Sequence, residues 1–186
     1  MRKLLVFLSL FFMPWFGFLI YAQTGQVSPK EQVYFSPHGG CTEAIVKNLG
    51  QAEKTVLVQA YSFTSEPIAD ALVNAHKRGV KVQVLLDKSQ RHGKGSKLGL
   101  LVDAGIPVSV DAKHSIAHNK VMIIDGVTVI TGSFNFTSAA EDKNAENLLV
   151  TRNKALAAQY RDNWNRHRKH SVPYSPEHDG VQTHNV

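Results

Sequence analysis

Cysteine is almost absent from this sequence, since Cys41 is the only one among 186 residues. One cysteine excludes an internal disulfide and a cysteine-based metal site, so the fold depends on packing, with or without help from oligomerisation. A strict internal period is also absent, which argues against a repeat or fibrous architecture. Hydrophobic residues make up 43% and charged residues 19% of the chain. This composition and length are those of one globular domain.

Long apolar runs are absent except near the start of the chain. Arg2 and Lys3 precede an almost wholly apolar stretch that ends at Ala22. This is the layout of a cleaved export signal, which we favour, although the stretch is just long enough to span a bilayer. We therefore expect a periplasmic or secreted protein, or one anchored to the membrane through residues 4–22. The expected segments are a signal peptide or anchor at 1–22, a linker at 23–30, the folded domain at 31–170 and a mobile tail at 171–186.

Acidic residues are outnumbered, because 21 Lys and Arg face 15 Asp and Glu, for a net charge of +6. Removal of residues 1–22 takes away Arg2 and Lys3 and no acid, so 19 minus 15 leaves +4. A basic surface attracts polyanions such as nucleic acid or anionic lipid, but many basic proteins bind neither. The net charge is therefore compatible with a nucleic-acid partner but does not by itself indicate one.

Short apolar strands alternate with helical segments in the first half of the domain. Strands are predicted at 33–35, 55–61 and 80–86, and helices at 42–51 and 67–78, the first of them with Thr42 as N-cap. Such a succession implies parallel strands joined by helical crossovers. The expected fold class is α/β, with a mixed, largely parallel β-sheet flanked by helices.

A hairpin is predicted in the second half of the domain. Asp125 and Gly126 lie between two apolar runs, 121–124 and 127–131, and Asp-Gly is a strong turn signal between strands. Further elements are predicted at 98–104, 106–110, 148–151 and 155–169, the last a helix with Leu156, Tyr160 and Trp164 on its core face.

Four polar side chains flank this hairpin. His118 and Lys120 alternate on the incoming strand and so point to the same side, and Ser133 and Asn135 alternate in the same way after the outgoing strand. Because the hairpin folds the second pair back beside the first, we expect the four side chains to converge.

The four side chains suit an anionic tetrahedral group. Lys120 supplies positive charge, Ser133 and Asn135 supply neutral donors, and His118 can attack phosphorus or move a proton. Glu146 is the nearest downstream acid that could hold His118 through its other ring nitrogen. The set therefore predicts phosphodiester chemistry.

Other interpretations compete at three places. For Asp125 we favour a conformational role in the turn over a catalytic one. His114 and His118 have the spacing of a zinc pair, but such a pair needs a helix and no third ligand is in view, so no metal site is expected. The run from Arg166 to His170 is explained by the preference of cations for a helix C-terminus.

A basic segment over residues 88–97 follows the strand at 80–86. Such a charge run can be a flexible, solvated connector. It also follows the carboxyl end of a strand, where ligands bind to open α/β sheets, so a role in binding substrate phosphates is at least as well supported. The candidate substrate-binding residues are Lys88, Arg91, Lys94 and Lys97.

The polar set resembles the HKD motif of the phospholipase D superfamily, whose members cleave or exchange phosphodiesters. The matching run is His118-x-Lys120-x4-Asp125-x6-Gly132-Ser133-x-Asn135. The segments 59–64, 79–82 and 144–147 also look like those of small bacterial Nuc-type endonucleases, so the resemblance covers most of the chain from Val33 to about Trp164.

The resemblance implies a homodimer, because most of the superfamily carries two such motifs in one chain and this chain has one. It assigns one His118 as the nucleophile that forms a phosphohistidine, and the His118 of the second chain as the general acid. No metal or other cofactor is needed in that scheme. The remaining roles that it implies are phosphoryl binding by Lys120, Ser133 and Asn135 and orientation of the histidine by Glu146.

Three functions are compatible with these features. The favoured one is a sequence-nonspecific endonuclease acting on DNA or RNA, since no base-reading element is recognised. The alternative is a phospholipase D-type hydrolase of membrane phospholipids, which an uncleaved N-terminal segment would favour. A non-catalytic polyanion-binding module is the third, and the intact catalytic set argues against it.

Overall fold

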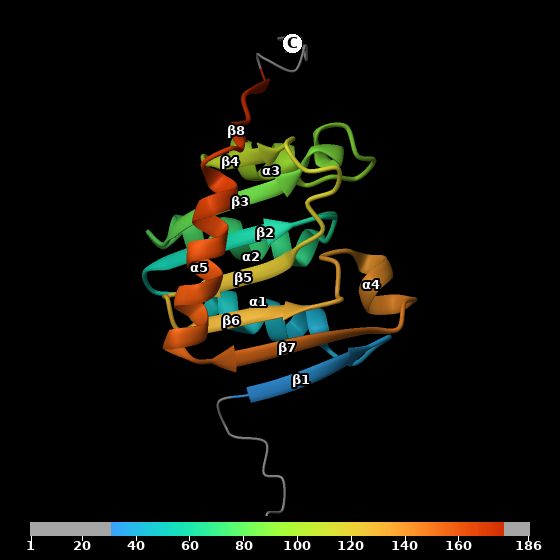
Figure 1. Ribbon diagram of the computed structural model, residues 1–186. Helices are drawn as coiled ribbons and strands as arrows, with labels where there is room; N and C mark the ends of the chain where they lie inside the picture. Colours follow the sequence, from blue (N-terminus) through green and yellow to red (C-terminus); the bar gives the residue numbers. More distant parts are fainter. Residues whose placement is uncertain (1–30, 177–186) are drawn as a thin grey trace, which may run out of the picture.

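The computed structural model describes residues 31–176, which form one eight-stranded mixed sheet with helices on both faces (Figure 1). The predicted signal or anchor and the linker lie outside the described residues, as do residues 177–186 of the predicted tail. The strands are β1 (Glu31–Ser36), β2 (Thr55–Ala60), β3 (Lys81–Asp87), β4 (Val108–Asp111), β5 (Lys120–Ile124), β6 (Thr128–Gly132), β7 (Glu146–Arg152) and β8 (Val172–Pro173). The helices are α1 (Cys41–Gly50), α2 (Glu66–Lys77), the 3-10 helix η1 (Lys88–Arg91), α3 (Leu98–Asp103), α4 (Ser138–Asp142) and α5 (Lys154–Arg168).

The sheet has a parallel part and an antiparallel part, in the order β1-β7-β6-β5-β2-β3-β4-β8. Its parallel part is confined to β2, β3 and β4, whose connections contain helices, while the other five of the seven neighbouring pairs are antiparallel. The predicted mixed α/β class is confirmed, with a smaller parallel share than expected, because the turn after β5 and the longer connection through α4 after β6 both return the chain antiparallel.

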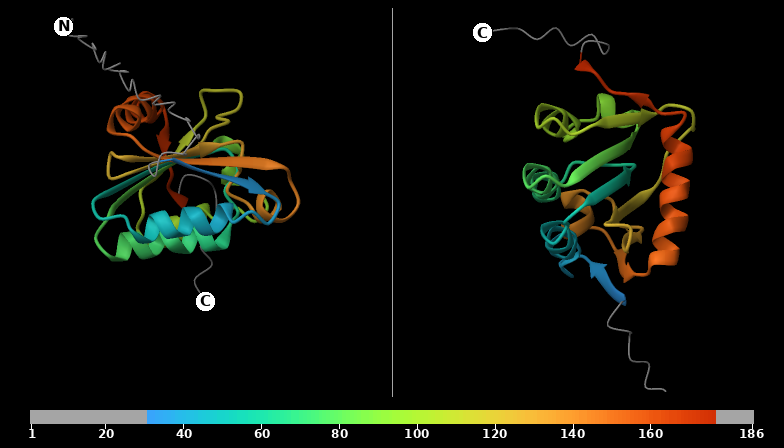
Figure 2. Two further views of the ribbon diagram at one scale, coloured as in Figure 1. Left: turned by 90° about the horizontal axis from the view of Figure 1, so that it is seen from below. Right: turned by 90° about the vertical axis from the view of Figure 1, so that its left-hand side faces the viewer.

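Helices cover the two faces of the sheet unequally. Figure 2 shows α1, α2 and α3 side by side on one face and α5 alone across the other. Alternation along β2 sends Val56 and Val58 toward the three helices, while Val121 and Ile123 of β5 pack with Trp164 under α5. The Trp164 indole also donates a 2.9 Å hydrogen bond to the Val58 carbonyl, which fixes α5 on the sheet.

The Asp-Gly turn forms as predicted between β5 and β6. Asp125 and Gly126 have φ values of 54° and 64°, a backbone region that aspartate and glycine tolerate best. The Val127 N–H closes the turn on the Ile124 carbonyl at 3.0 Å.

The start of α1 differs from the prediction. Gly40, not Thr42, is the N-cap, and it makes no side-chain capping bond. The carboxylate of Glu141 instead accepts the Gly40 and Thr42 backbone N–H groups, at 3.2 and 2.7 Å. A residue about a hundred positions away thus does the capping, and no local pattern could have indicated it.

Residues 88–97, predicted as a flexible loop, and residues 171–176, the described start of the predicted tail, both make hydrogen bonds to the rest of the domain. Residues 88–97 begin with η1, in which Gln90 is buried and accepts the Phe63 N–H at 3.1 Å. The start of the predicted tail is β8, which pairs with β4 and is followed by a hydrogen bond from the Tyr174 N–H to the Val108 carbonyl. Within residues 31–176, none of the helices is long and apolar enough to cross a membrane.

Candidate active site

The predicted polar residues lie where β5 begins and β6 ends. Val121 pairs with Thr131 in the hairpin, and Lys120 pairs with Ala60 at the carboxyl end of β2. His118 lies just before β5, and Ser133 and Asn135 lie just after β6. The structure therefore brings these residues to one edge of the sheet, where the parallel strands β2, β3 and β4 also end.

Tyr61 lies between His118 and Lys120. Its ring centroid is 4.5 Å from that of His118, and the Lys120 Nζ lies 5.1 Å from the ring centroid of Tyr61. The same Nζ donates to the His118 carbonyl at 3.2 Å. Tyr61 was not among the predicted site residues, because its aromatic ring reads as core in the sequence. It holds the ammonium close to the imidazole.

Lys120 is a buried cation, with only 6% of its surface exposed. Burial lowers the pKa of its ammonium, and the negative charge of Glu146 opposes that effect. A buried ammonium with one carbonyl partner retains donor capacity for an anion. Lys120 is thus suited to hold a phosphoryl oxygen.

The side chains of Asn135 and Ser133 differ in their hydrogen bonds. The Asn135 side-chain oxygen is buried without a hydrogen-bond partner among the described residues. The Ser133 hydroxyl accepts the backbone N–H and the side-chain amide of Asn147, at 3.1 and 3.3 Å. A buried acceptor without a partner is costly unless a donor reaches it, so Asn135 is the stronger candidate for direct contact with a ligand, and contact with a phosphate oxygen would use its amide N–H group.

Gly132 joins β6 to this polar segment and cannot carry a side chain. Its φ is 154°, and a Cβ built on it would lie 2.2 Å from the Asn147 carbonyl oxygen. The backbone of β7 therefore passes directly against Gly132. This close approach lets Asn147 reach Ser133.

Glu146 lies near Lys120 but is not joined to His118. Among the described residues, its carboxylate accepts a hydrogen bond from the Asn144 amide at 3.3 Å. Its charge acts on Lys120, as the direction of its effect on the pKa of that ammonium shows. Orientation of His118 by Glu146 stays a prediction.

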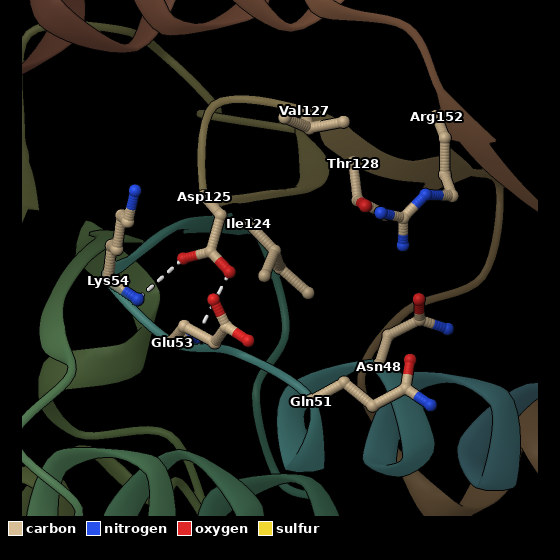
Figure 3. A pocket seen from close by; sticks show the side chains of 9 residues that line it. All are labelled: Asn48, Gln51, Glu53, Lys54, Ile124, Asp125, Val127, Thr128 and Arg152. Atoms are coloured by element: carbon tan, nitrogen blue, oxygen red, sulfur yellow. Dashed lines mark hydrogen bonds between the residues drawn. The ribbon is translucent and has the colours of Figure 1, made fainter.

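Asp125 is not brought to this edge. It follows β5 at the other end of the strand, and its carboxylate accepts the backbone N–H groups of Glu53, Lys54 and Thr55 at 3.0, 2.7 and 2.9 Å. Burial alone would raise its pKa, but these hydrogen bonds outweigh it and lower the pKa. Figure 3 shows the carboxylate turned toward residues 53 and 54, beside a pocket of about 270 Å³ that lies away from His118. Asp125 therefore has a structural role, which is to bind the backbone that leads into β2.

Asp87 is a residue of this edge that the sequence analysis missed. It ends β3, is 2% exposed, and accepts the N–H groups of Ala117 and Ser89 at 2.7 and 2.9 Å. These bonds outweigh burial and lower its pKa. The only signal in the sequence is an aspartate at the end of an apolar strand. Asp87 holds the loop that carries His118.

The basic segment lies beside the same edge, since the Lys97 N–H donates to the Phe63 carbonyl. Its cations have partners within the protein. Lys88 donates to the His114 carbonyl at 3.2 Å, Lys97 lies 3.4 Å from Glu66, and Arg91 lies over the Tyr174 ring. Lys94 is exposed, which makes it the best placed of the four to meet a polymer.

His114 and His118 do not form a zinc pair, because the segment between β4 and β5 is not helical. The helix that such a pair needs is absent, but further potential ligands do lie near His114, namely Asp111, His167 and His170. His114 instead turns toward Asp111 at the end of β4, 2.9 Å away.

Comparison with known proteins relates this arrangement to one family. The model of the family described as "Cardiolipin synthase, PLD-like domain" matches residues 45–168. A "Phospholipase D" of Rickettsia typhi is 50% identical over 130 residues, which are 70% of this chain and 64% of that protein. A "Mitochondrial cardiolipin hydrolase" of Xenopus tropicalis is 32% identical over 116 residues, 62% of this chain and 55% of that protein. The chain thus matches less than two thirds of the length of either relative.

Solved structures share the fold over almost their whole length. Nuc from Salmonella typhimurium, described as a phospholipase D family member, is 38% identical with a TM-score of 0.74, covering 77% of this chain and 97% of that one. NucT from Helicobacter pylori is 26% identical with a TM-score of 0.73, covering 78% of this chain and 99% of that one.

Proposed function

The chain belongs to the phospholipase D-like family, and we propose that it is a phosphodiesterase that uses His118 as nucleophile and needs no metal at the reacting phosphate. The observation that carries the proposal is a buried ammonium with spare donor capacity next to His118. Lys120 is 6% exposed, and its Nζ donates to the His118 carbonyl at 3.2 Å, so a three-donor ammonium keeps N–H groups for an anion. Buried polar groups of this kind are retained where a ligand completes them.

The reaction would proceed in two balanced steps. The His118 imidazole attacks phosphorus, and the leaving oxygen takes a proton from a second histidine, which gives a phosphohistidine and a free alcohol. Water then attacks the phosphohistidine and returns a proton to the second histidine, which releases His118. The Lys120 ammonium and the side-chain N–H group of Asn135 stabilise the charge on the non-bridging oxygens in both steps.

A second copy of the chain is the source of the second histidine in this proposal, because the sequence holds one such motif. Two large apolar side chains at the same edge support a dimer contact there. Ile116 lies two residues before His118 and is 56% exposed, and Phe35 pairs with Asn147 and is 65% exposed. A two-fold contact over this edge would cover both and place two imidazoles together.

Polynucleotide is the substrate that we propose first. The support is the near-complete overlap with Nuc and NucT and the basic segment with exposed Lys94 beside the site. Phospholipid is the second candidate, and its support is the names of the relatives in Rickettsia typhi and Xenopus tropicalis.

A direct assay separates the two substrates. The purified chain is incubated with plasmid DNA, with RNA and with cardiolipin vesicles, in excess EDTA, while circular dichroism verifies that the chain stays folded. Cleavage of DNA or RNA that His118→Ala abolishes supports the nuclease. Release of phosphatidic acid without cleavage of either nucleic acid would make the lipid hydrolase correct, and activity on none of them by the folded protein would overturn the metal-free phosphodiesterase.

Lys94 provides a finer test of polymer capture. Lys94→Gln should raise KM for DNA and flatten its salt dependence, with little change for a small chromogenic phosphodiester. Lys77→Gln is the matched control, because Lys77 is an exposed lysine at the end of α2 that lies away from this edge. Equal effects of the two substitutions would remove the basic segment from the substrate path.

A further inference from the structure

Three histidines surround one buried carboxylate at the end of β4, outside the set of residues that flank the hairpin. Asp111 ends β4 and its side chain is 1% exposed. Its Oδ2 lies 2.9 Å from His114 Nδ1, 2.9 Å from His167 Nδ1 and 3.2 Å from His170 Nε2. The four potential ligand atoms all lie within 4.8 Å of one another.

The cluster is assembled from two separate parts of the chain. Asp111 and His114 are three residues apart around the end of β4, while His167 lies in the last turn of α5 and His170 just beyond it. The three rings lie 4.9 to 5.4 Å apart between centroids and are tilted or edge-on to one another, so none stacks flat on another. One nitrogen of each ring lies within 3.2 Å of the same atom, Oδ2 of Asp111.

The other oxygen of Asp111 is used to aim the first. Its Oδ1 accepts the backbone N–H groups of Lys113 and His114, at 3.1 and 3.4 Å. The carboxylate is thereby fixed with Oδ2 toward the rings.

Hydrogen bonding alone explains this arrangement poorly. A carboxylate oxygen has two lone pairs, and each neutral imidazole carries a proton on only one of its two nitrogens. Three N–H groups on one oxygen would require His114 and His167 to carry their proton on Nδ1 and His170 to carry its proton on Nε2, or the rings to be charged. A cation among the four atoms removes that demand, because lone pairs of all three nitrogens and of Oδ2 then point at it.

The donor set and spacing select the cation. Three imidazoles and one carboxylate suit Zn²⁺, which prefers four tetrahedral ligands at about 2.0–2.2 Å. Ligand atoms of such a tetrahedron lie about 3.3 Å apart, close to the Asp111–histidine distances. Four protein ligands leave no open position, which is the pattern of structural and not catalytic zinc sites.

We propose that Asp111, His114, His167 and His170 form a structural zinc site that ties the end of α5 to the end of β4. The ion would join the helix that covers one face to the edge of the sheet, immediately before β8 pairs with β4. It would also fix His114, four residues before His118, and so anchor the first half of the loop that carries the nucleophile. This role is separate from the proposed phosphodiester chemistry, which needs no metal at the reacting phosphate.

Metal content gives the primary test. The full chain is expressed without a polyhistidine tag, dialysed against metal-free buffer and analysed by mass spectrometry of its metals. We expect close to one zinc per chain for the wild type and for His118→Ala, and less than about a tenth of that for His167→Gln and Asp111→Asn. His92→Gln is the matched control, since His92 is an exposed histidine outside the cluster. Zinc content equal in His167→Gln and His92→Gln would overturn the proposal.

Two further readouts protect the test against variants that fail to fold. Wild-type protein stripped with chelator should unfold at a temperature about 5–10 °C lower than the same protein with one equivalent of Zn²⁺ restored. Co²⁺ bound in place of zinc should give the intense visible bands of a tetrahedral site. Stripped wild type that neither takes up zinc nor rises in unfolding temperature would show that the cluster is a hydrogen-bonded histidine group only. Loss of nuclease activity with zinc still bound would count against the proposed function and leave the zinc site intact.

Discussion

The two ends of the β5–β6 hairpin belong to the same motif and are built in opposite ways. At the turn, the Asp125 carboxylate accepts three backbone N–H groups. At the open end, the Asn135 side-chain oxygen is buried without a partner among the described residues, and the Lys120 ammonium meets one carbonyl and one ring. Satisfied polar groups mark the end that shapes the fold, and under-satisfied ones mark the end that meets a ligand.

The largest effect should come from the open end. His118→Ala should lower turnover by about ten-thousandfold, because nucleophile and general acid are lost together from a dimer. The unfolding temperature should stay close to that of the wild type, since His118 contributes little to the core. Initial rates on DNA and thermal unfolding are measured side by side, with His92→Ala as control. Turnover within tenfold of the wild type would remove His118 from the chemistry.

Gly132, at the base of the open end, should give the largest loss of stability. Gly132→Ala places a Cβ about where the Asn147 carbonyl oxygen lies, at 2.2 Å. We expect the free energy of unfolding to fall by about 3 kcal/mol, as in strained or overpacked sites. Gly50→Ala is the control, since a Cβ at Gly50 meets nothing within 4 Å. Equal urea midpoints for the two variants would contradict the close approach of β7.

The turn end should lose stability and keep its chemistry. Asp125→Asn should lower the free energy of unfolding at pH 7 by about 2 kcal/mol. One backbone N–H group loses its acceptor, and the remaining N–H groups donate to a neutral oxygen in place of a charged one. Turnover per folded molecule should change less than about threefold. A loss of turnover much larger than the loss of folded protein would show that Asp125 acts in catalysis.

The pH dependence sharpens this test. The folded-state pKa of Asp125 is lowered, so its contribution to stability is complete above its unfolded pKa of about 3.9 and is lost as pH falls through the folded pKa. The difference in unfolding free energy between wild type and Asp125→Asn should therefore shrink below about pH 4. Asp162→Asn, at an exposed position on α5, should show no such dependence.

Asp87 should give the smallest effect, since it acts on the open end only through the loop. Asp87→Asn removes one acceptor from the pair formed with the Ala117 and Ser89 N–H groups. We expect kcat to fall about tenfold with KM little changed, and stability to fall by about 1 kcal/mol. The exposed Asp103→Asn serves as control. A rise in KM without a change in kcat would show that Asp87 supports substrate binding instead.

Local chemistry explains why much of this molecule could be predicted from sequence. The hairpin was predictable because Asp125 and Gly126 tolerate positive φ, and the hairpin brings His118, just before β5, and Asn135, just after β6, to one edge. The mixed α/β class followed from alternating strands and helices. Each of these signals depends on residues that are near neighbours in the chain.

Long-range contacts explain what could not be predicted. Glu141 caps α1 from about a hundred residues away, and Asp87 reaches Ala117 across η1, α3 and β4. The cluster around Asp111 joins residues from two ends of the domain, so the cations at the end of α5 read as ordinary helix-terminal charges. The spacings Asp111-x2-His114 and His167-x2-His170 were the one available hint, and each alone is common.

The loop between β4 and β5 loses its conformational entropy before any substrate arrives. Asp111 lies at its start, Asp87 fixes Ala117 within it, and the Tyr61 N–H binds the Asn119 carbonyl at its end at 2.8 Å. Ordering the backbone of one residue costs about 1–2 kcal/mol, so a slack loop would consume binding energy at every encounter with a substrate. Here that loss occurs once, when the chain folds, and the substrate meets an imidazole already in position.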